Sequence, residues 1–201
     1  GDITPQADSV PLRLAGALHA LVLNGHAKLT PVYPTNSATD DALWTAVSEA
    51  LVTDATFIDD WINSPPQTNE VRRSAALIPI GNWLADRYGL PMVVMELGAS
   101  AGLNLMWDRF GLQIQDATFG PDHPALTLTP DWTGPLPSPA QPNIASRKGV
   151  DLNPLDPTTD ALRLRAYLWP DQPERRELTD AAIACQDAHV AQNDAIAWLS
   201  N

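Results

Sequence analysis

Residues Met92 to Arg109 read MVVMELGASAGLNLMWDR, which is the pattern of a strand, a tight turn and a helix. Met92 to Leu97 is an apolar run with one acid, Glu96, and such runs are typical of strands buried on both faces of a parallel sheet. The five small residues from Gly98 to Gly102 predict a tight turn. Apolar residues then recur at helical spacing as far as Phe110, which predicts a helix with one buried side.

The turn fits two chemistries. As E-x-G-x-S-x-G it is a loop whose backbone can approach a nucleotide cofactor, close to the start of a helix. As G-x-S-x-G it is a nucleophile elbow in which Ser100 attacks, with His123 or His189 as the base. A third alternative is a tight connection between a strand and its covering helix, with no binding role.

Composition excludes several classes of protein. The chain has 201 residues, of which 44% are hydrophobic, and no apolar run approaches the ~20 residues of a membrane span. Its net charge of -12 repels a phosphate backbone, so nucleic acid is an unfavourable partner. The four histidines have no ligand-like spacing, and the single cysteine, Cys185, agrees with a reducing compartment. We expect a cytoplasmic protein with no membrane contact and no metal site.

Residues 1–90 look helical throughout. Their last helix should run to about Tyr88, and the polar segment Gln67 to Ser74 leads into it. Thr68 or Asn69 is a plausible cap for that helix. Because this helix continues directly into the apolar strand, its polar end could fold over the carboxyl edge of that strand, where ligands of open α/β sheets bind.

Two further acids follow candidate strands. Asp151 ends a short strand, and its two carboxylate oxygens match the two hydroxyls of a ribose. The alternative is that Asp151 caps the turn before Asn153 and Pro154. Asp151 lies 49 positions after Gly102, whereas the usual offset is roughly 20. The proline-rich stretch at about 116–145 would then be an insertion. Asp194 follows a brief final strand and is either a helix cap or a second cofactor contact.

After the helix that follows the turn we expect two short strands, Leu112 to Asp116 and Ala125 to Thr129, which could pair with each other. Seven prolines between Pro121 and Pro142 exclude regular structure from most of the remainder.

These residues resemble a known family. The Glu96–Gly102 loop resembles the first motif of class I S-adenosylmethionine-dependent methyltransferases, and the chain is similar more specifically to the bacterial domain of unknown function 2332 family, which is grouped with them. Two more stretches resemble the ribose-binding and adenine-binding strand ends of these enzymes, Gly149–Pro154 and Gln192–Ala195. The stretches that resemble the bacterial family are Ser64–Glu70, Glu96–Leu105, Asp151–Asp156 and Trp169–Gln172.

The resemblance implies an α/β fold in which a helical N-terminal region, 1–90, packs on a sheet formed by 91–201. That sheet would be an incomplete Rossmann-like, methyltransferase-type parallel sheet flanked by helices, whose C-terminal strands are absent from this chain. The sheet edge left exposed would allow a homodimer.

The resemblance also implies S-adenosylmethionine as cofactor and an unknown methyl acceptor. Three residues near the helix start would close the site, and orient an acceptor or act as base: Asn69, Glu70 and Arg73. The expected cofactor-binding residues are Gln67, Glu96, Gly98, Ser100, Gly102, Asn104, Asp151 and Asp194. The alternatives are a serine hydrolase that uses Ser100 and a non-catalytic cofactor-binding or interaction module.

Overall fold

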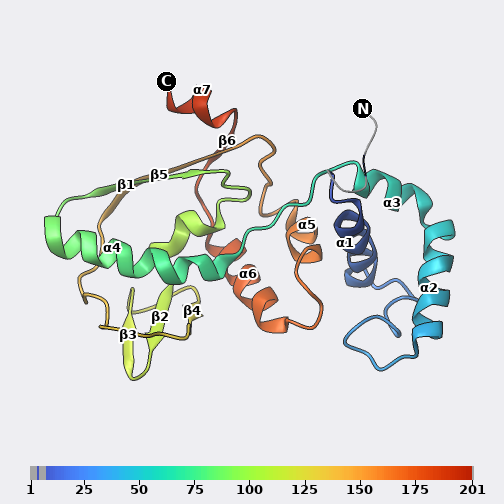
Figure 1. The fold of residues 1–201 in the computed structure, drawn as a ribbon. Coiled ribbons are helices and arrows are strands. Elements are labelled where there is room, and N and C mark those ends of the chain that lie inside the picture. The colour runs from blue at the N-terminus through green and yellow to red at the C-terminus, as the bar shows by residue number, and fades with distance from the viewer. Residues whose placement is uncertain (1–3, 5–7, 201) are drawn as a thin grey trace. The chain divides into compact units, whose positions relative to one another are not determined.

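The computed structural model describes Thr4 and residues 8–200 and shows two compact units (Figure 1). The first unit is formed by the chain up to Thr68 together with Asp160–Arg176. The second is formed by 69–159 together with the chain from Glu177 onward. Each unit therefore combines two stretches that lie far apart in the sequence.

The first unit is helical, as the sequence predicted for this part of the chain. Pro11 lies in the first turn of its first helix, where a missing N–H costs no hydrogen bond. The hydroxyl of Thr39 caps the second helix by accepting a hydrogen bond from the backbone N–H of Ala42 (3.2 Å). The helices are α1 (Val10–Leu23), α2 (Asp40–Thr53), α3 (Ala55–Ile62), α5 (Ala161–Ala166) and the start of α6 (Pro173–Cys185).

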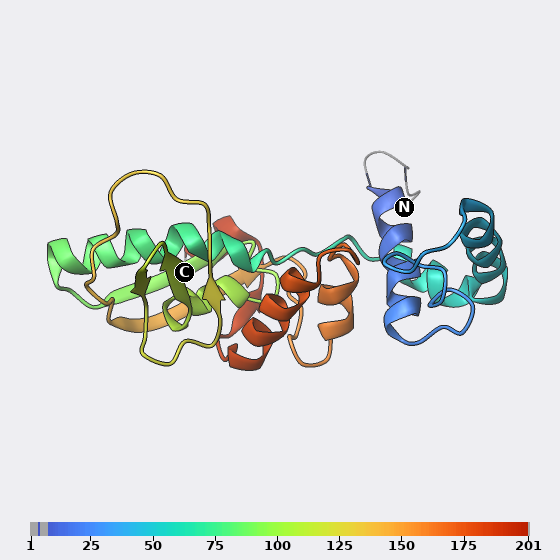
Figure 2. The same cartoon turned by 90° about the horizontal axis from the view of Figure 1, so that it is seen from below.

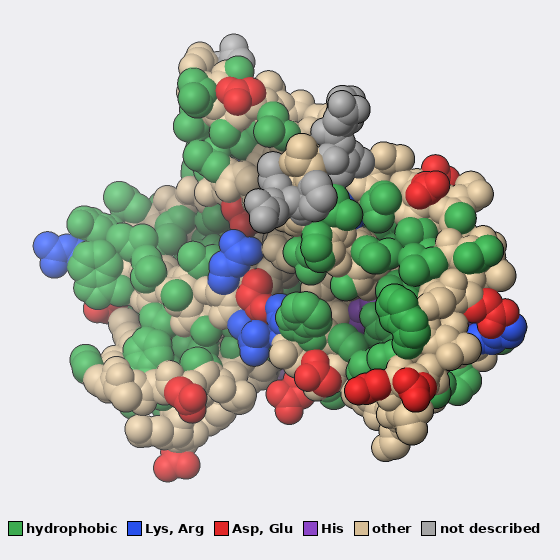
Figure 3. Space-filling model, turned by 45° about the vertical axis from the view of Figure 1, so that its right-hand side comes forward, with side chains coloured by type: hydrophobic (Ala, Val, Ile, Leu, Met, Phe, Trp, Pro, Cys, Tyr) green, Lys and Arg blue, Asp and Glu red, His purple; other side chains and the backbone are tan. Residues whose placement is uncertain are grey.

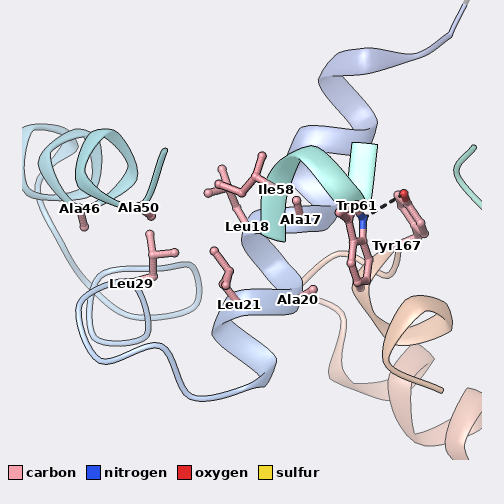
Figure 4. Packing of buried hydrophobic residues seen from close by; sticks show 11 residues of the cluster. Ala17, Leu18, Ala20, Leu21, Leu29, Ala46, Ala50, Ile58, Trp61 and Tyr167 are labelled. Atoms are coloured by element: carbon pink, nitrogen blue, oxygen red, sulfur yellow. Dashed lines mark hydrogen bonds between the residues drawn. The ribbon is translucent and has the colours of Figure 1, made fainter. Parts of the chain in front are cut away.

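A buried cluster holds the first unit together (Figure 4). One face of α1 supplies its centre, and α3 and α5 pack against α1. Trp61 Nε1 donates a hydrogen bond to the hydroxyl of Tyr167 (3.2 Å), and the guanidinium of Arg163 lies 4.3 Å from the Trp61 ring centroid. The segment that returns at residue 160 is thus bound to the N-terminal helices by both packing and polar contacts.

The second unit contains a three-stranded parallel sheet with the order β1 (Met92–Leu97), β5 (Ile144–Asp151) and β6 (Val190–Gln192). Glu96 lies opposite Gly149, and Asp151 lies opposite Gln192. The predicted strands before the small-residue turn, before Asp151 and before Asp194 are confirmed. Because all three run in the same direction, their carboxyl ends meet at one edge of the sheet.

One face of this sheet is covered by a helical layer. The 3-10 helix η2 (Leu103–Arg109) contacts β1, β5 and α4 (Ser74–Tyr88), which the short 3-10 helix η1 (Val71–Arg73) precedes (Figure 2). The prediction of a one-sided helix after the turn is wrong in detail, because η2 is a 3-10 helix and Leu103 to Trp107 are all buried. Its residues contact both the sheet and α4, so it has no polar face over that stretch.

The prediction that β1 is buried on both faces is also wrong. β1 forms an edge of the sheet, and Val93, Met95 and Leu97 remain 51 to 56% exposed. The helix on that side of the sheet, α7 (Ala195–Leu199), contacts β5. Hydrophobic side chains are also visible among acidic and basic ones on the face of the molecule drawn in Figure 3.

A second small sheet follows η2. Its strands are β2 (Gly111–Ile114), β3 (Ala117–Phe119) and β4 (Thr127–Leu128), in the order β3-β2-β4. The predicted pairing of the first and last of these segments is confirmed, and it is parallel. β3 was not predicted, and it pairs with β2 as an antiparallel hairpin. Apart from β4, residues 121–142 have no regular structure, as the prolines predicted.

The packing of α4 on η2 depends on Gly81. A Cβ atom at this position would lie 2.1 Å from the ring of Trp107. Alanine is normally better than glycine in a helix by about 1 kcal/mol, but here we expect Gly81→Ala to destabilise the protein by about 1–3 kcal/mol through overpacking. Urea unfolding measures the change. In a Trp107→Leu background the same substitution should lose most of its cost, and an equal cost in both backgrounds would contradict the clash.

Candidate functional site

The turn after β1 has an unusual backbone. Gly98, Ser100 and Gly102 all have positive φ angles, of 69°, 53° and 71°. A Cβ at Gly98 would meet nothing within 4 Å, so this side of the turn is open, whereas a Cβ at Gly102 would lie 2.8 Å from Gln186 and 2.9 Å from Val190. Glycine suits the left-handed region, but serine does not, so Ser100 is held there by its surroundings.

Asp151 supplies one of the contacts that hold Ser100. Its Oδ2 accepts a hydrogen bond from the backbone N–H of Ser100 (2.8 Å), and its Oδ1 accepts one from Asn153 N–H (2.8 Å). The carbonyl of Val150 also accepts bonds from Gly98 and Ala99 N–H groups (2.8 and 3.1 Å). The end of β5 therefore fixes the turn after β1, and most N–H groups of that turn are already used within the protein.

Asn69 holds the turn from its other side. Its buried side chain accepts a hydrogen bond from Leu103 N–H (2.8 Å) and donates one to the carbonyl of Ala99 (3.4 Å). The prediction that Thr68 or Asn69 caps the following helix is wrong. The cap is Glu70, whose carboxylate accepts from Arg72 N–H (3.1 Å) and also forms a salt bridge with the Arg72 side chain.

A second buried amide, Asn104, joins η2 to the same segment. It accepts a hydrogen bond from the hydroxyl of Ser74 (2.9 Å) and donates one to the carbonyl of Glu70 (3.3 Å). Asn104 lies within the apolar run Leu103 to Trp107, and this pattern could have predicted a buried, hydrogen-bonded amide from the sequence. The bonds of Asn69 gave no comparable sign, because a polar segment before a helix usually faces water.

Glu96 and Arg73 share a cavity beside the turn. The cavity has a volume of about 220 Å³, and Asn104 completes its polar lining. Its apolar walls are Leu77, Val94, Met95, Leu105 and Trp107. Glu96 and Arg73 form no salt bridge, and Glu96 Oε2 is buried without a hydrogen-bond partner among the described residues.

Burial raises the pKa of Glu96 to about 7, an effect that the positive charge of Arg73 opposes and the negative charge of Asp151 assists. The cavity thus contains two groups of opposite charge that do not pair: the carboxyl group of Glu96, with an oxygen that has no partner among the described residues, and the guanidinium of Arg73 nearby.

Asp194 lies beyond the end of β6, on the same sheet edge as Asp151. Its Oδ1 accepts hydrogen bonds from the N–H groups of Ile196 and Ala197 (3.0 Å each), so it is the N-cap of α7. Asn193 N–H donates to the carbonyl of Asp151 (3.0 Å), which connects the two strand ends.

The structure thus brings most of the predicted cofactor residues to one edge of the second unit. Gln67 belongs to the first unit. The residues at or beside this edge are Glu96, Gly98, Ser100, Gly102, Asn104, Asp151 and Asp194.

Ser100 lacks the geometry of a nucleophile. Its Oγ atom is buried and has no hydrogen-bond partner in the part of the chain that the structure describes. Neither His123 nor His189 accepts its proton, although an activated serine needs a base within hydrogen-bond reach.

Comparison with known families places the chain. The model of a family described as an uncharacterized protein conserved in bacteria (DUF2332) matches residues 1–201. The chain belongs to this family. No curated protein and no solved structure matches it. Among the described residues, no helix is long and apolar enough to cross a membrane, and no group of three or more His, Cys, Asp or Glu side chains is arranged to hold a metal ion.

The strain at Ser100 can be measured. Ser100→Gly removes a left-handed serine and a buried hydroxyl that has no hydrogen-bond partner in the described part of the chain. We therefore expect it to stabilise the fold by about 1 kcal/mol in urea unfolding. Ser100→Ala is the matched control, because it removes the hydroxyl but keeps a Cβ atom at positive φ. A glycine variant no more stable than the alanine variant would show that the backbone at this position is not strained.

Glu96 should make stability depend on pH. Its pKa in the folded protein, about 7, exceeds the ordinary value of 4.5, so the neutral acid is favoured by folding. This contribution is complete below the ordinary pKa and is lost as the pH rises through about 7. The free energy of unfolding of Glu96→Gln, minus that of the native protein, should therefore rise by about 1–2 kcal/mol from about pH 5 to about pH 8. This figure is reduced because solvent partly screens the carboxyl group.

Urea unfolding at the two pH values tests this, with Glu177→Gln, a change at an exposed glutamate, as the control. A stability difference between Glu96→Gln and the native protein that does not change with pH would contradict the burial of this carboxyl group.

Proposed function

We propose that this protein binds S-adenosylmethionine at the carboxyl edge of β1, β5 and β6 and transfers its methyl group to an acceptor. The observation that carries the proposal is the cavity shared by Glu96 and Arg73 beside the open turn. A methionine tail has an ammonium, a carboxylate and a short apolar chain. The Glu96 carboxylate, the Arg73 guanidinium and the apolar walls of the cavity match these three groups.

The ribose would lie next along the same edge, at Asp151. Each oxygen of this carboxylate accepts one backbone N–H, and each has a second lone pair for a ribose hydroxyl. Asp194, beyond the neighbouring strand, is within the same row of strand ends, and its Oδ2 atom remains for the adenine amino group. The open side of Gly98 leaves space above the turn between these positions.

In this proposal Asn69 and Glu70 act on the site through the backbone. Asn69 fixes the turn that the cofactor would cover, and Glu70 caps the segment that presents Arg73. Methyl transfer depends mainly on alignment of donor and acceptor, so a rigid turn is what this chemistry requires. The Rossmann-like, methyltransferase-type arrangement predicted from sequence is consistent with the order β1-β5-β6 and belongs to the same proposal.

Isothermal titration calorimetry with S-adenosylmethionine and with its demethylated product tests the proposal. Arg73→Gln and Glu96→Gln should each weaken binding at least tenfold, about 1.4 kcal/mol. Arg72→Gln is the matched control, because Arg72 is the adjacent exposed arginine, pairs with Glu70 and does not line the cavity. Affinity of the native protein should rise between about pH 6 and about pH 8 as Glu96 ionises, and this rise should disappear in Glu96→Gln.

Absence of heat with both ligands would reject the proposal, as would equal losses in Arg73→Gln and Arg72→Gln. Binding without methylation of any candidate acceptor would leave a non-catalytic cofactor-binding protein.

A further inference from the structure

A separate cavity, of about 170 Å³, lies within the first unit. Its walls come from α1, the loop after α1, α5, the connection from α5 into α6 and the first turn of α6. Part of this connection is Trp169–Gln172, a stretch that the sequence singles out and that the cofactor proposal leaves without a role. The polar and aromatic residues that line the cavity are His19, Thr35, Arg165, Trp169, Gln172 and Arg176.

Among the residues that the structure describes, the lining contains two guanidinium groups and no carboxylate. Such a concentration of positive charge is unexpected in a protein whose net charge is -12. Arg176 forms no salt bridge with any other residue in the part of the chain that the structure describes. Arg165 and Arg176 both line the cavity, and arginine side chains suit an anion because their planar forks donate to oxyanions in a fixed geometry.

The pKa of His19, which also lines this cavity, bears on which residues carry the positive charge. Burial lowers the pKa of His19, hydrogen bonding to the carbonyls of Ala166 and Leu168 opposes this, and the positive charge of Arg176 lowers the pKa further. A neutral His19 donates from Nδ1 to the carbonyl of Ala166 (3.1 Å), so its Nε2 atom carries no proton. The positive charge in the cavity therefore comes from Arg165 and Arg176.

Neutral donors accompany these arginines. Gln172 Oε1 accepts a hydrogen bond from Arg175 Nη1 (2.8 Å), which orients the amide and leaves its NH₂ group as the donor side. The hydroxyl of Thr35 can also donate. Donors from four separate segments exceed what a flat carboxylate uses, but they suit the terminal oxygens of a tetrahedral phosphate.

An aromatic and apolar surface adjoins the charged lining. Trp169 is 54% exposed, and Leu168 and Pro170 lie on either side of it in the chain. A smaller apolar cavity of about 30 Å³ shares His19 and Leu168–Pro170 with the first and extends to Tyr33 and Tyr167. The smaller cavity has room for only about one or two water molecules, so the planar or apolar body of a ligand would lie against the exposed ring of Trp169.

We propose that this cavity binds a small phosphate monoester, with its phosphate on Arg165, Arg176 and Gln172 and its planar or apolar body against Trp169. The site lies within one unit of the protein and is independent of the methyl-transfer proposal.

Calorimetric titration of the full chain with phenyl phosphate tests this site. We expect one molecule to bind, with at least tenfold weaker binding in Arg176→Gln and none detectable in Arg165→Gln/Arg176→Gln. Trp169→Ala should weaken binding of phenyl phosphate but not of inorganic phosphate. Lys28→Gln is the control, because it removes one positive charge from the same unit at an exposed position outside the cavity, and its affinity should match that of the native chain.

Circular dichroism confirms that each variant folds. If Arg176→Gln does not fold, Arg176→Lys replaces it, since lysine keeps the charge and loses the planar fork. Its affinity for phenyl phosphate should lie between that of the native chain and that expected of Arg176→Gln. Benzoate distinguishes a phosphate site from a general anion site, and benzoate binding as tight as that of phenyl phosphate would overturn the assignment. Absence of phenyl phosphate binding, or equal affinities of Arg176→Gln and Lys28→Gln, would overturn it as well.

Discussion

The hydrogen bond from Ser100 N–H to the carboxylate of Asp151 joins the turn after β1 to the end of β5, and the second unit is built around this junction. It crosses 51 positions of sequence and holds a serine at positive φ. Asn69 and Asn104 attach the same turn and its helix to the segment before α4. Three polar side chains thus convert a flexible small-residue loop into a defined surface, because each satisfies backbone groups that would otherwise be buried without partners.

The polar side chains beside the turn differ in how completely they are hydrogen-bonded. Asn69, Asn104 and Asp151 have hydrogen bonds to the backbone, whereas Glu96 retains a buried oxygen beside Arg73 that has no partner among the residues the structure describes. A fold tolerates such an oxygen at an energetic cost, which is commonly found where a ligand supplies the missing contact. The first unit shows the same contrast, since Arg163 stacks on Trp61 within the core while Arg176 lines a cavity without a salt bridge in the described chain.

Local patterns in the sequence predicted where helices and strands lie better than they predicted how far each element is buried. The apolar run at Met92 was found because buried parallel strands are apolar, and the strand that ends at Asp151 was found because an acid and a turn follow Val150 there. The exposure of Val93, Met95 and Leu97 could not be predicted, because an apolar strand reads the same whether or not another element covers it. The 3-10 form of η2 was missed for a related reason, since helical spacing does not distinguish it from an α-helix over two turns.

The sequence by itself determined where the turn lies, which acids end the strands and that the first part of the chain is helical, because these features depend on neighbouring residues. Only the tertiary structure decided that Asn69 holds the turn rather than capping a helix, that the Ser100 hydroxyl has no hydrogen-bond partner among the described residues, and that Glu96 faces a cavity with Arg73. Only the tertiary structure showed that residues 160–176 form one unit with the helices at the start of the chain. These results depend on contacts between residues distant in sequence, and the hydrogen bonds and charges that give each side chain its role arise only when the chain has folded.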